Sequence, residues 1–138
     1  MKPLYILVFF MFLSCNKRIN NTNTPLETVI KLQSAEECKN YAEASKYIDV
    51  VSVYSEYSKK VGLTPVQYWK EVVNISFNIG LVKIFSNSFK YYEYDILESI
   101  DDATATVEFS PIDRRGRKTR YSLHLVKNKW IVVKIQYL

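Results

Sequence analysis

The chain has 138 residues, of which 19 are Lys or Arg and 14 are Asp or Glu, so its formal net charge is +5. This length suits one domain with a sizeable core and excludes a multidomain protein. The single histidine and the two cysteines do not have the spacing of a zinc site, so we expect no metal and no cofactor.

The first predicted element is a leader at the amino terminus. Ten apolar residues run from Leu4 to Leu13, after a lysine and shortly before Cys15. The apolar part of a secretory leader is about 7 to 15 residues long, whereas a membrane-spanning helix needs about 20. Residues 1–14 are therefore predicted to be a signal peptide that is removed.

The end of this leader, Phe12-Leu13-Ser14-Cys15, resembles the bacterial lipoprotein box, with Phe where Leu is usual. The resemblance implies transfer of a diacylglyceryl group to the Cys15 sulfur, cleavage before Cys15 and acylation of the new amino terminus. Several acyl chains hold a small domain stably on a membrane. The alternative is an ordinary signal peptide that merely contains a cysteine. Asn16 is not the Asp that retains enterobacterial lipoproteins in the inner membrane, so by analogy we expect the outer membrane, facing the periplasm.

The segment after the leader, residues 15–24, is predicted to be a lipid anchor and tether, because it is mostly Asn and Thr and buries little. An envelope location makes nucleic acid an unexpected partner for this mildly basic chain. Because a lipidated Cys15 cannot form a disulfide, Cys38 stands alone, either as a reactive thiol or as a small buried hydrophobe. Its place beside a helical pattern favours the buried hydrophobe.

Two helix starts follow in the first half of the remaining chain. Thr24-Pro25-Leu26-Glu27 offers an N-cap, a Pro at the first helical position and a capping-box acid. Thr64-Pro65-Val66-Gln67 repeats this signal before a second amphipathic helix. A short helical stretch is expected between them, around residues 41–48. Tyr54 and Tyr57, ahead of the second start, are interpreted as core packing rather than as part of a ligand site.

The second half alternates apolar and polar residues, which is the pattern of half-buried strands. Asp101-Asp102 is predicted to be a two-residue turn that pairs Tyr94 with Phe109. A three-residue loop with Gly116 in the left-handed conformation then pairs Phe109 with Tyr121. Both registers place the apolar side chains on one face of a sheet.

The last hairpin has two candidate turns. A two-residue turn at Asn128-Lys129 would bury polar side chains without evident partners. A three-residue loop, Lys127-Asn128-Lys129, instead pairs Tyr121 with Ile135 and keeps one face apolar, so we predict this loop.

These elements predict an α+β domain over residues 25–138, with amino-terminal helices packed on the concave face of a curved antiparallel sheet of about four strands. The chain resembles a nuclear transport factor 2-like domain of the cystatin-like cone type. The resemblance is carried by the opening helix, by the break into a short helix from Glu36 to Ala44, and by the closing segment from Val126 to Val132. It implies a pocket within the cone but no particular reaction.

Any pocket is expected where tyrosines gather on the inner face of the sheet, because bulky rings hold the covering helices at a distance. The alternative is that the tyrosines fill this space, with their hydroxyls reaching the edge of the core. Its candidate lining residues are Tyr92, Tyr94, Phe109, Tyr121 and Trp69. Enzymes of the resembling family use inward-pointing Asp, His and Tyr side chains, whereas His124 and Asp95 are predicted to point outward here. We therefore expect no catalytic residue, and an isomerase- or dehydratase-like enzyme is the alternative.

Two surface features remain. A basic hairpin tip consists of Arg114, Arg115, Arg117, Lys118 and Arg120. It is interpreted as solvated, the alternative being contact with anionic headgroups or an acidic partner. Asp95 and Glu108 are predicted to lie opposite each other on the outer face, as an exposed pair. The sequence thus predicts a lipid-anchored envelope protein with a small binding or accessory domain, whose ligand is unidentified and could be a small apolar molecule. The alternative is a protein-protein module of the envelope-assembly or immunity type that uses the outer face of the sheet, with a homodimer included.

Overall fold

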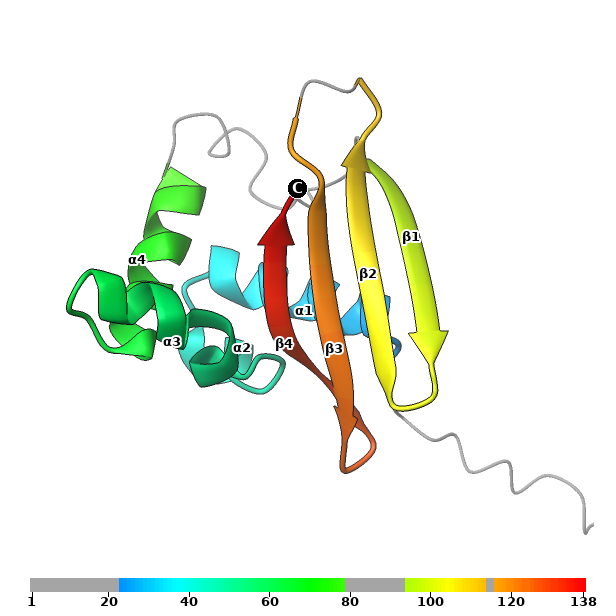
Figure 1. Ribbon diagram of the computed structural model, residues 1–138, viewed down its shortest axis with the longest axis horizontal. Helices are drawn as coiled ribbons and strands as arrows, with labels where there is room; N and C mark the ends of the chain where they lie inside the picture. Colours follow the sequence, from blue (N-terminus) through cyan, green and yellow to red (C-terminus); the bar gives the residue numbers. More distant parts are fainter. Residues whose placement is uncertain (1–22, 79–93, 114–115) are drawn as a thin grey trace, which may run out of the picture.

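The computed structural model describes residues 23–78, 94–113 and 116–138. The described chain forms helices followed by a four-stranded antiparallel sheet (Figure 1). The helices are α1 (Pro25–Glu37), α2 (Tyr41–Ala44), α3 (Val50–Lys60) and α4 (Pro65–Asn78). The strands are β1 (Tyr94–Asp101), β2 (Thr104–Pro111), β3 (Thr119–Val126) and β4 (Lys129–Tyr137). This is the predicted α+β class, whereas the predicted leader and most of the tether lie outside the described residues.

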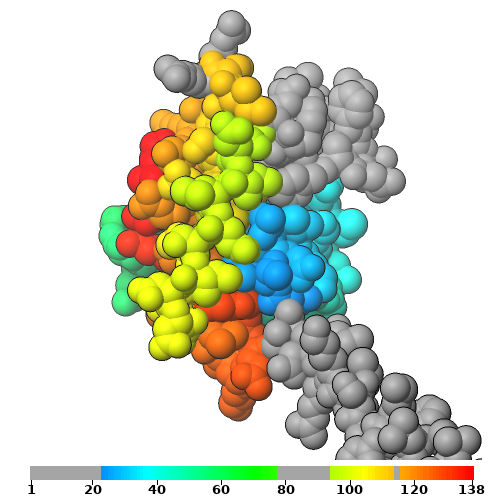
Figure 2. Space-filling view, turned by 90° about the vertical axis from the view of Figure 1, so that its right-hand side faces the viewer, coloured from blue at the N-terminus to red at the C-terminus, as the bar shows by residue number. Residues whose placement is uncertain are grey.

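Helix α1 begins where its sequence signal predicts. The Thr24 hydroxyl accepts a hydrogen bond from the Glu27 amide (3.1 Å), and the Glu27 carboxylate accepts one from the Thr24 amide (2.9 Å). A carboxylate from β1, that of Glu98, accepts a further bond from the Leu26 amide (2.7 Å). Negative charge is favourable at a helix amino terminus, so this contact ties α1 to β1. The two elements lie directly against each other (Figure 2).

The four strands follow one another as a meander, and α1 crosses the inner face of the curved sheet (Figure 1). Between helix and sheet lie fully buried side chains: Val29 and Leu32 from α1, and Val107, Phe109, Leu123 and Val132 from the strands. The buried hydrophobic residues of the described chain come from positions between 29 and 132. The described residues therefore contain a core of their own.

In the first two hairpins, each residue lies opposite a partner that is two positions away from the predicted one. Tyr94 lies opposite Pro111 instead of Phe109. In the next pair, Phe109 lies opposite Thr119 instead of Tyr121. Side chains alternate with a period of two, so a shift of two residues returns each of them to the same face. The predicted pairing is wrong, but the predicted core face is correct.

The connections between the strands explain these shifts. Asp102 and Ala103 make the first turn, and Asp102 takes a φ of 52°, a left-handed conformation that Asp adopts more readily than most residues. The second connection is longer than three residues, because β2 ends at Pro111 and β3 begins at Thr119. Gly116 is not left-handed there, contrary to the prediction. A Cβ atom at Gly116 would lie 2.9 Å from Cγ of Pro111, so glycine permits a close approach of the two segments.

The last hairpin differs from both turns considered for it. Lys127 and Asn128 occupy the two central positions with φ angles of 48° and 61°, the backbone of a tight hairpin turn. The register near the turn is therefore wrong by one residue, whereas Tyr121 keeps its predicted partner Ile135. A β-bulge in β4 absorbs the extra residue, so that Val132 faces the core.

Helix α3 was not predicted from the sequence. Its N-cap, Asp49, accepts hydrogen bonds from the amide and the hydroxyl of Ser52 (3.1 and 2.7 Å). Just before the helix, the chain pairs with the edge of β4: the Asp49 amide donates to the Val132 carbonyl and the Val132 amide to the Tyr47 carbonyl, both at 2.9 Å. This short bridge holds α3 beside β4, and α4 packs against α3 (Figure 1).

Of the other two helix predictions, one is confirmed at its start and the other gives too long a helix. The predicted start of α4 is confirmed, because the Thr64 hydroxyl accepts from the Gln67 amide (3.2 Å) and the Gln67 side chain accepts from the Thr64 amide (3.0 Å). Helix α2 is shorter than the predicted stretch and ends at Ala44. The capping signals were thus more informative than the apolar spacing alone.

Cys38 is exposed, so its interpretation as a small buried hydrophobe is wrong. It lies at the C-cap of α1, and the next residue, Lys39, takes a positive φ of 54°. The chain turns away from the core at this point, and the last residue of the helix pattern is left facing solvent.

Candidate ligand-binding cleft

The residues predicted to line a pocket lie mostly within the core. Trp69 and Tyr121 are 2% exposed and Phe109 is fully buried. The rings of Phe109 and Tyr121 meet edge to face, with centroids 5.7 Å apart. Tyr94 packs against this cluster while partly exposed, and Tyr92 lies outside the described residues. The structure therefore brings three of these aromatic residues together as core packing.

Two polar side chains of α1 hold the buried aromatic residues in place. The Trp69 indole N–H donates to the Glu36 carboxylate (2.7 Å), and the Gln33 side-chain N–H donates to the Tyr121 hydroxyl (2.7 Å). Both α1 side chains are buried. Polar groups removed from water cost free energy unless they are hydrogen bonded. These two bonds therefore offset the cost of burying polar groups within the aromatic core.

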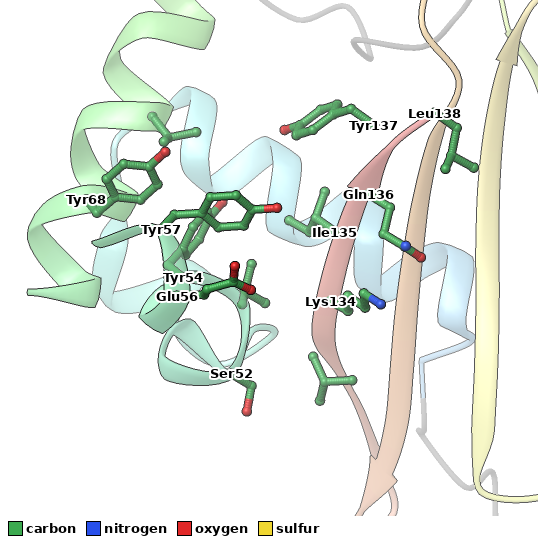
Figure 3. A pocket seen from close by; sticks show the side chains of 13 residues that line it. Ser52, Tyr54, Glu56, Tyr57, Tyr68, Lys134, Ile135, Gln136, Tyr137 and Leu138 are labelled. Carbon is green, nitrogen blue, oxygen red and sulfur yellow. The ribbon is translucent and has the colours of Figure 1, made fainter. Parts of the chain in front are cut away.

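A separate cleft of about 740 Å³ lies between α3, α4 and β4 (Figure 3). Its lining comprises the apolar Val53, Val72, Val133, Ile135 and Leu138, the aromatic Tyr54, Tyr57, Tyr68 and Tyr137, and the polar Ser52, Glu56, Lys134 and Gln136. Sites for small molecules typically measure about 300 to 1,000 Å³. The cleft therefore has the size and the mainly apolar lining of such a site.

Tyrosines dominate the helical wall of the cleft. The rings of Tyr57 and Tyr68 are stacked, with centroids 6.3 Å apart and planes inclined by 9°. Tyr54 lies beside Tyr68, with its ring centroid 5.8 Å away. Tyr54 is buried, whereas Tyr57 is 50% exposed. The wall thus presents a flat aromatic surface that is only half covered by the protein.

Charged groups lie at the opening of the cleft. Glu56 projects from α3 and Lys134 from β4, and both are exposed (Figure 3). Glu56 accepts a hydrogen bond from Lys60 (2.9 Å), and this bond lowers the pKa of the Glu56 carboxyl. The opening therefore carries both signs of charge at neutral pH, while the interior is apolar and aromatic.

A smaller hollow of about 20 Å³ adjoins the cleft. It shares four lining residues with the cleft, Tyr54 and Tyr137 among them, and α1 lines it with Gln33 and Glu36. The side-chain oxygen of Gln33 is buried and has no hydrogen-bond partner among the described residues. The hollow that adjoins the cleft therefore has polar side chains on its α1 side.

Sequence reasoning missed the cleft because it missed α3. Tyr54 was correctly assigned to the core, but the assignment of Tyr57 to the core is wrong, since half of this side chain is exposed. The signal that could have revealed the helix is Asp49 as an N-cap, followed by Val50, Val53 and Tyr57 at helical spacing.

The outer face of the sheet does not carry the predicted carboxylate pair. Asp95 lies opposite Ser110, because of the register shift described above. Glu108 instead accepts hydrogen bonds from Arg120 (2.8 and 2.9 Å) and forms an ion pair with Lys118 (2.8 Å). These two cations, Lys118 foremost, hold the pKa of Glu108 below its usual value.

Replacing Glu108 by glutamine is expected to lower the free energy of unfolding at neutral pH by on the order of 1 kcal/mol. Because the pKa of Glu108 is lower in the folded than in the unfolded chain, its contribution is present above the ordinary carboxyl pKa and is lost as the pH falls through the folded value. The difference between wild type and Glu108→Gln in urea unfolding should therefore shrink as the pH is lowered below the ordinary carboxyl pKa. Asp95→Asn, which removes an exposed carboxylate from the same face, should leave the unfolding curve unchanged. A difference that stays constant over this range would contradict the ion-pair assignment.

The basic tip lies partly within the described structure. Residues 114–115 are outside it, and Arg117 is exposed. Lys118 and Arg120 are both engaged by Glu108, so they belong to an ion-pair cluster on the outer face. This engagement weakens the case for a fully available basic patch.

His124 is exposed, and no cluster of three or more metal-binding side chains occurs in the described ranges. Within the same ranges, no helix has the length and apolar character needed to cross a membrane. Comparisons of the chain with protein-family models, curated proteins and solved structures found no match. The geometry of the cleft is therefore the main support for a functional assignment.

Proposed function

We propose that this domain binds a small, largely apolar and planar molecule in the cleft between α3, α4 and β4. The observation that carries the proposal is the cleft of about 740 Å³ with its tyrosine wall. Aromatic side chains bind flat rings through offset stacking and edge contacts. A large, mostly apolar hollow with a few polar groups is the usual form of a small-molecule site.

The contacts of the wall indicate how a ligand would gain affinity. Val53 and Val72 from the helices and Ile135 from β4 provide an apolar floor. The Tyr57 ring is stacked on Tyr68 but remains half exposed. Covering apolar area gains about 25 cal/mol per Å². A flat ligand laid on Tyr57 would remove its exposed area from water without requiring the wall to move.

The charged groups favour binding over catalysis. Glu56 lies at the opening, exposed and already hydrogen bonded to Lys60. Its pKa is lowered rather than raised towards neutrality, whereas a general acid or base works best with a pKa near the working pH. The cleft is therefore proposed as a binding site without a reaction.

We further propose that the domain is carried on a lipid anchor at Cys15, on the outer membrane and facing the periplasm. The support is the apolar leader and its likeness to a lipoprotein box. The resemblance to nuclear transport factor 2-like domains agrees with helices that precede a curved antiparallel sheet and with a hollow beside them. A short tether would keep the cleft close to the membrane surface, where apolar compounds collect.

Native mass spectrometry of the protein purified in detergent from its own envelope tests the binding proposal. We expect a small mass that accompanies the chain and is lost after mild denaturation. The double variant Tyr57→Ala, Tyr68→Ala removes the stacked pair and should carry at least about fivefold less of this mass, given that aromatic pairs contribute about 0.5 to 1.5 kcal/mol each.

Val51→Ala is the matched control, since Val51 is exposed on α3 but does not line the cleft. It should retain the full amount of bound compound. A protein that carries no compound, or a double variant that carries as much as the wild type, would contradict binding in this cleft.

A further inference from the structure

One buried polar atom beside the cleft has no hydrogen-bond partner among the described residues. Gln33 is 6% exposed, and its side-chain N–H donates to the Tyr121 hydroxyl at 2.7 Å. Its carbonyl oxygen, Oε1, has no hydrogen-bond partner among the described residues. Leaving a buried acceptor unpaired costs about 1 to 3 kcal/mol. A donor brought to this atom would recover that cost.

The hollow beside Gln33 adjoins the cleft. The two share Tyr54, Val72, Ile135 and Tyr137 as lining residues. A hollow of about 20 Å³ holds a single polar group of about the size of a water molecule. Tyr54 comes from the helical wall and Tyr137 from the strand wall, and Tyr137 is 58% exposed (Figure 3). The cleft and the hollow therefore lie side by side, with these two side chains in the walls of both.

The neighbours of this oxygen favour a donor over an acceptor. The Glu36 carboxylate, which also lines the hollow, accepts from Trp69. The Tyr121 hydroxyl accepts from Gln33. A ligand acceptor placed beside Oε1 of Gln33 and the Glu36 carboxylate would be repelled, whereas a hydroxyl or amine would be bound.

On the basis of the proposed function, we propose that the ligand is a planar ring compound with a hydroxyl or amine donor, and that this donor binds Oε1 of Gln33. The ring would lie along the tyrosine wall formed by Tyr54, Tyr57 and Tyr68, while the donor enters the hollow. The tyrosines thus supply affinity for flat apolar compounds in general, and Gln33 selects among them by their polar group.

A pair of probes that differ in the donor alone tests this selection. The chain from Asn16 onward, which contains the whole described core, is titrated with para-propylphenol and with its methyl ether, para-propylanisole, by proton–nitrogen correlation NMR. We expect the phenol to bind about tenfold more tightly. The resonances of the Gln33 side-chain amide should shift with the phenol and remain nearly still with the ether.

Gln33→Met removes the acceptor but keeps the length of the side chain. It should reduce the affinity for the phenol about tenfold, to the level of the ether, and leave the affinity for the ether unchanged. Thr28→Val is the matched control, because Thr28 also has a buried unpaired oxygen on α1 but lines neither hollow. It should alter neither affinity.

The outcomes separate this inference from the proposed function. Equal affinities for phenol and ether, both weakened by Tyr57→Ala, would overturn the role of Gln33 while leaving the cleft as the binding site. Failure of both probes to bind would overturn the two proposals together. The wild-type comparison decides between these results even if Gln33→Met does not fold.

Discussion

Replacing Trp69 by alanine is expected to lower the free energy of unfolding by about 3 to 5 kcal/mol. Trp69 is 2% exposed, its ring meets that of Tyr41 edge to face with centroids 5.3 Å apart, and its N–H donates to Glu36. The substitution removes the largest side chain type from the core and deprives a buried carboxylate of this donor. Urea unfolding followed by circular dichroism measures the loss.

Tyr57→Ala is the matched control for this prediction, because Tyr57 is also aromatic and helical but half exposed. It should cost about 1 kcal/mol or less. If the alanine variant is too unstable to purify, Trp69→Phe keeps a ring and still loses the bond to Glu36. A loss of under about 1 kcal/mol for Trp69→Ala would instead indicate that Trp69 lines an open cavity, as the sequence pattern suggested.

Replacing Cys15 by serine is expected to release the protein from the membrane. If Cys15 carries acyl chains, each buried methylene contributes about 0.8 kcal/mol to membrane binding, so their loss moves the partition by many orders of magnitude. Fractionation of cells, with mass spectrometry of the mature protein, measures both the location and the lipid mass.

Cys38→Ser is the matched control, since this second cysteine is exposed and lies within the folded domain. It should leave the protein in the membrane fraction with its lipid mass unchanged. A Cys15→Ser protein that has lost residues 1–14 and still stays in the membrane fraction would contradict the proposed anchor and favour another means of attachment.

The strands show what periodicity can and cannot predict. Alternation of apolar and polar residues places Val107, Phe109 and Leu123 on the core face, and the structure buries all three. The same alternation cannot distinguish two registers that differ by two residues, because both preserve the faces. The backbone conformation of the turn decides between the two registers. Residues that take a left-handed conformation, such as Asp102 and Asn128, are difficult to identify from the sequence when they are not glycine.

The cleft could not be predicted for a different reason. The cleft depends on how α3 and α4 are placed relative to β4. The pairing of the residues just before α3 with the edge of β4 sets that placement. That contact joins Ile48 to Val132, which are far apart in the sequence. Helical spacing could have placed Tyr54 and Tyr57 on one face of a helix, but local patterns do not reveal that β4 lies across a cleft from that face.

The most direct test of the ligand-binding cleft is a crystal structure of the protein purified from its own envelope without denaturation. We expect a bound planar compound between the Tyr57 and Tyr68 wall and β4, with a polar group within hydrogen-bond distance of the Gln33 side-chain oxygen. A cleft filled by the protein's own side chains, or by water alone, would contradict the account.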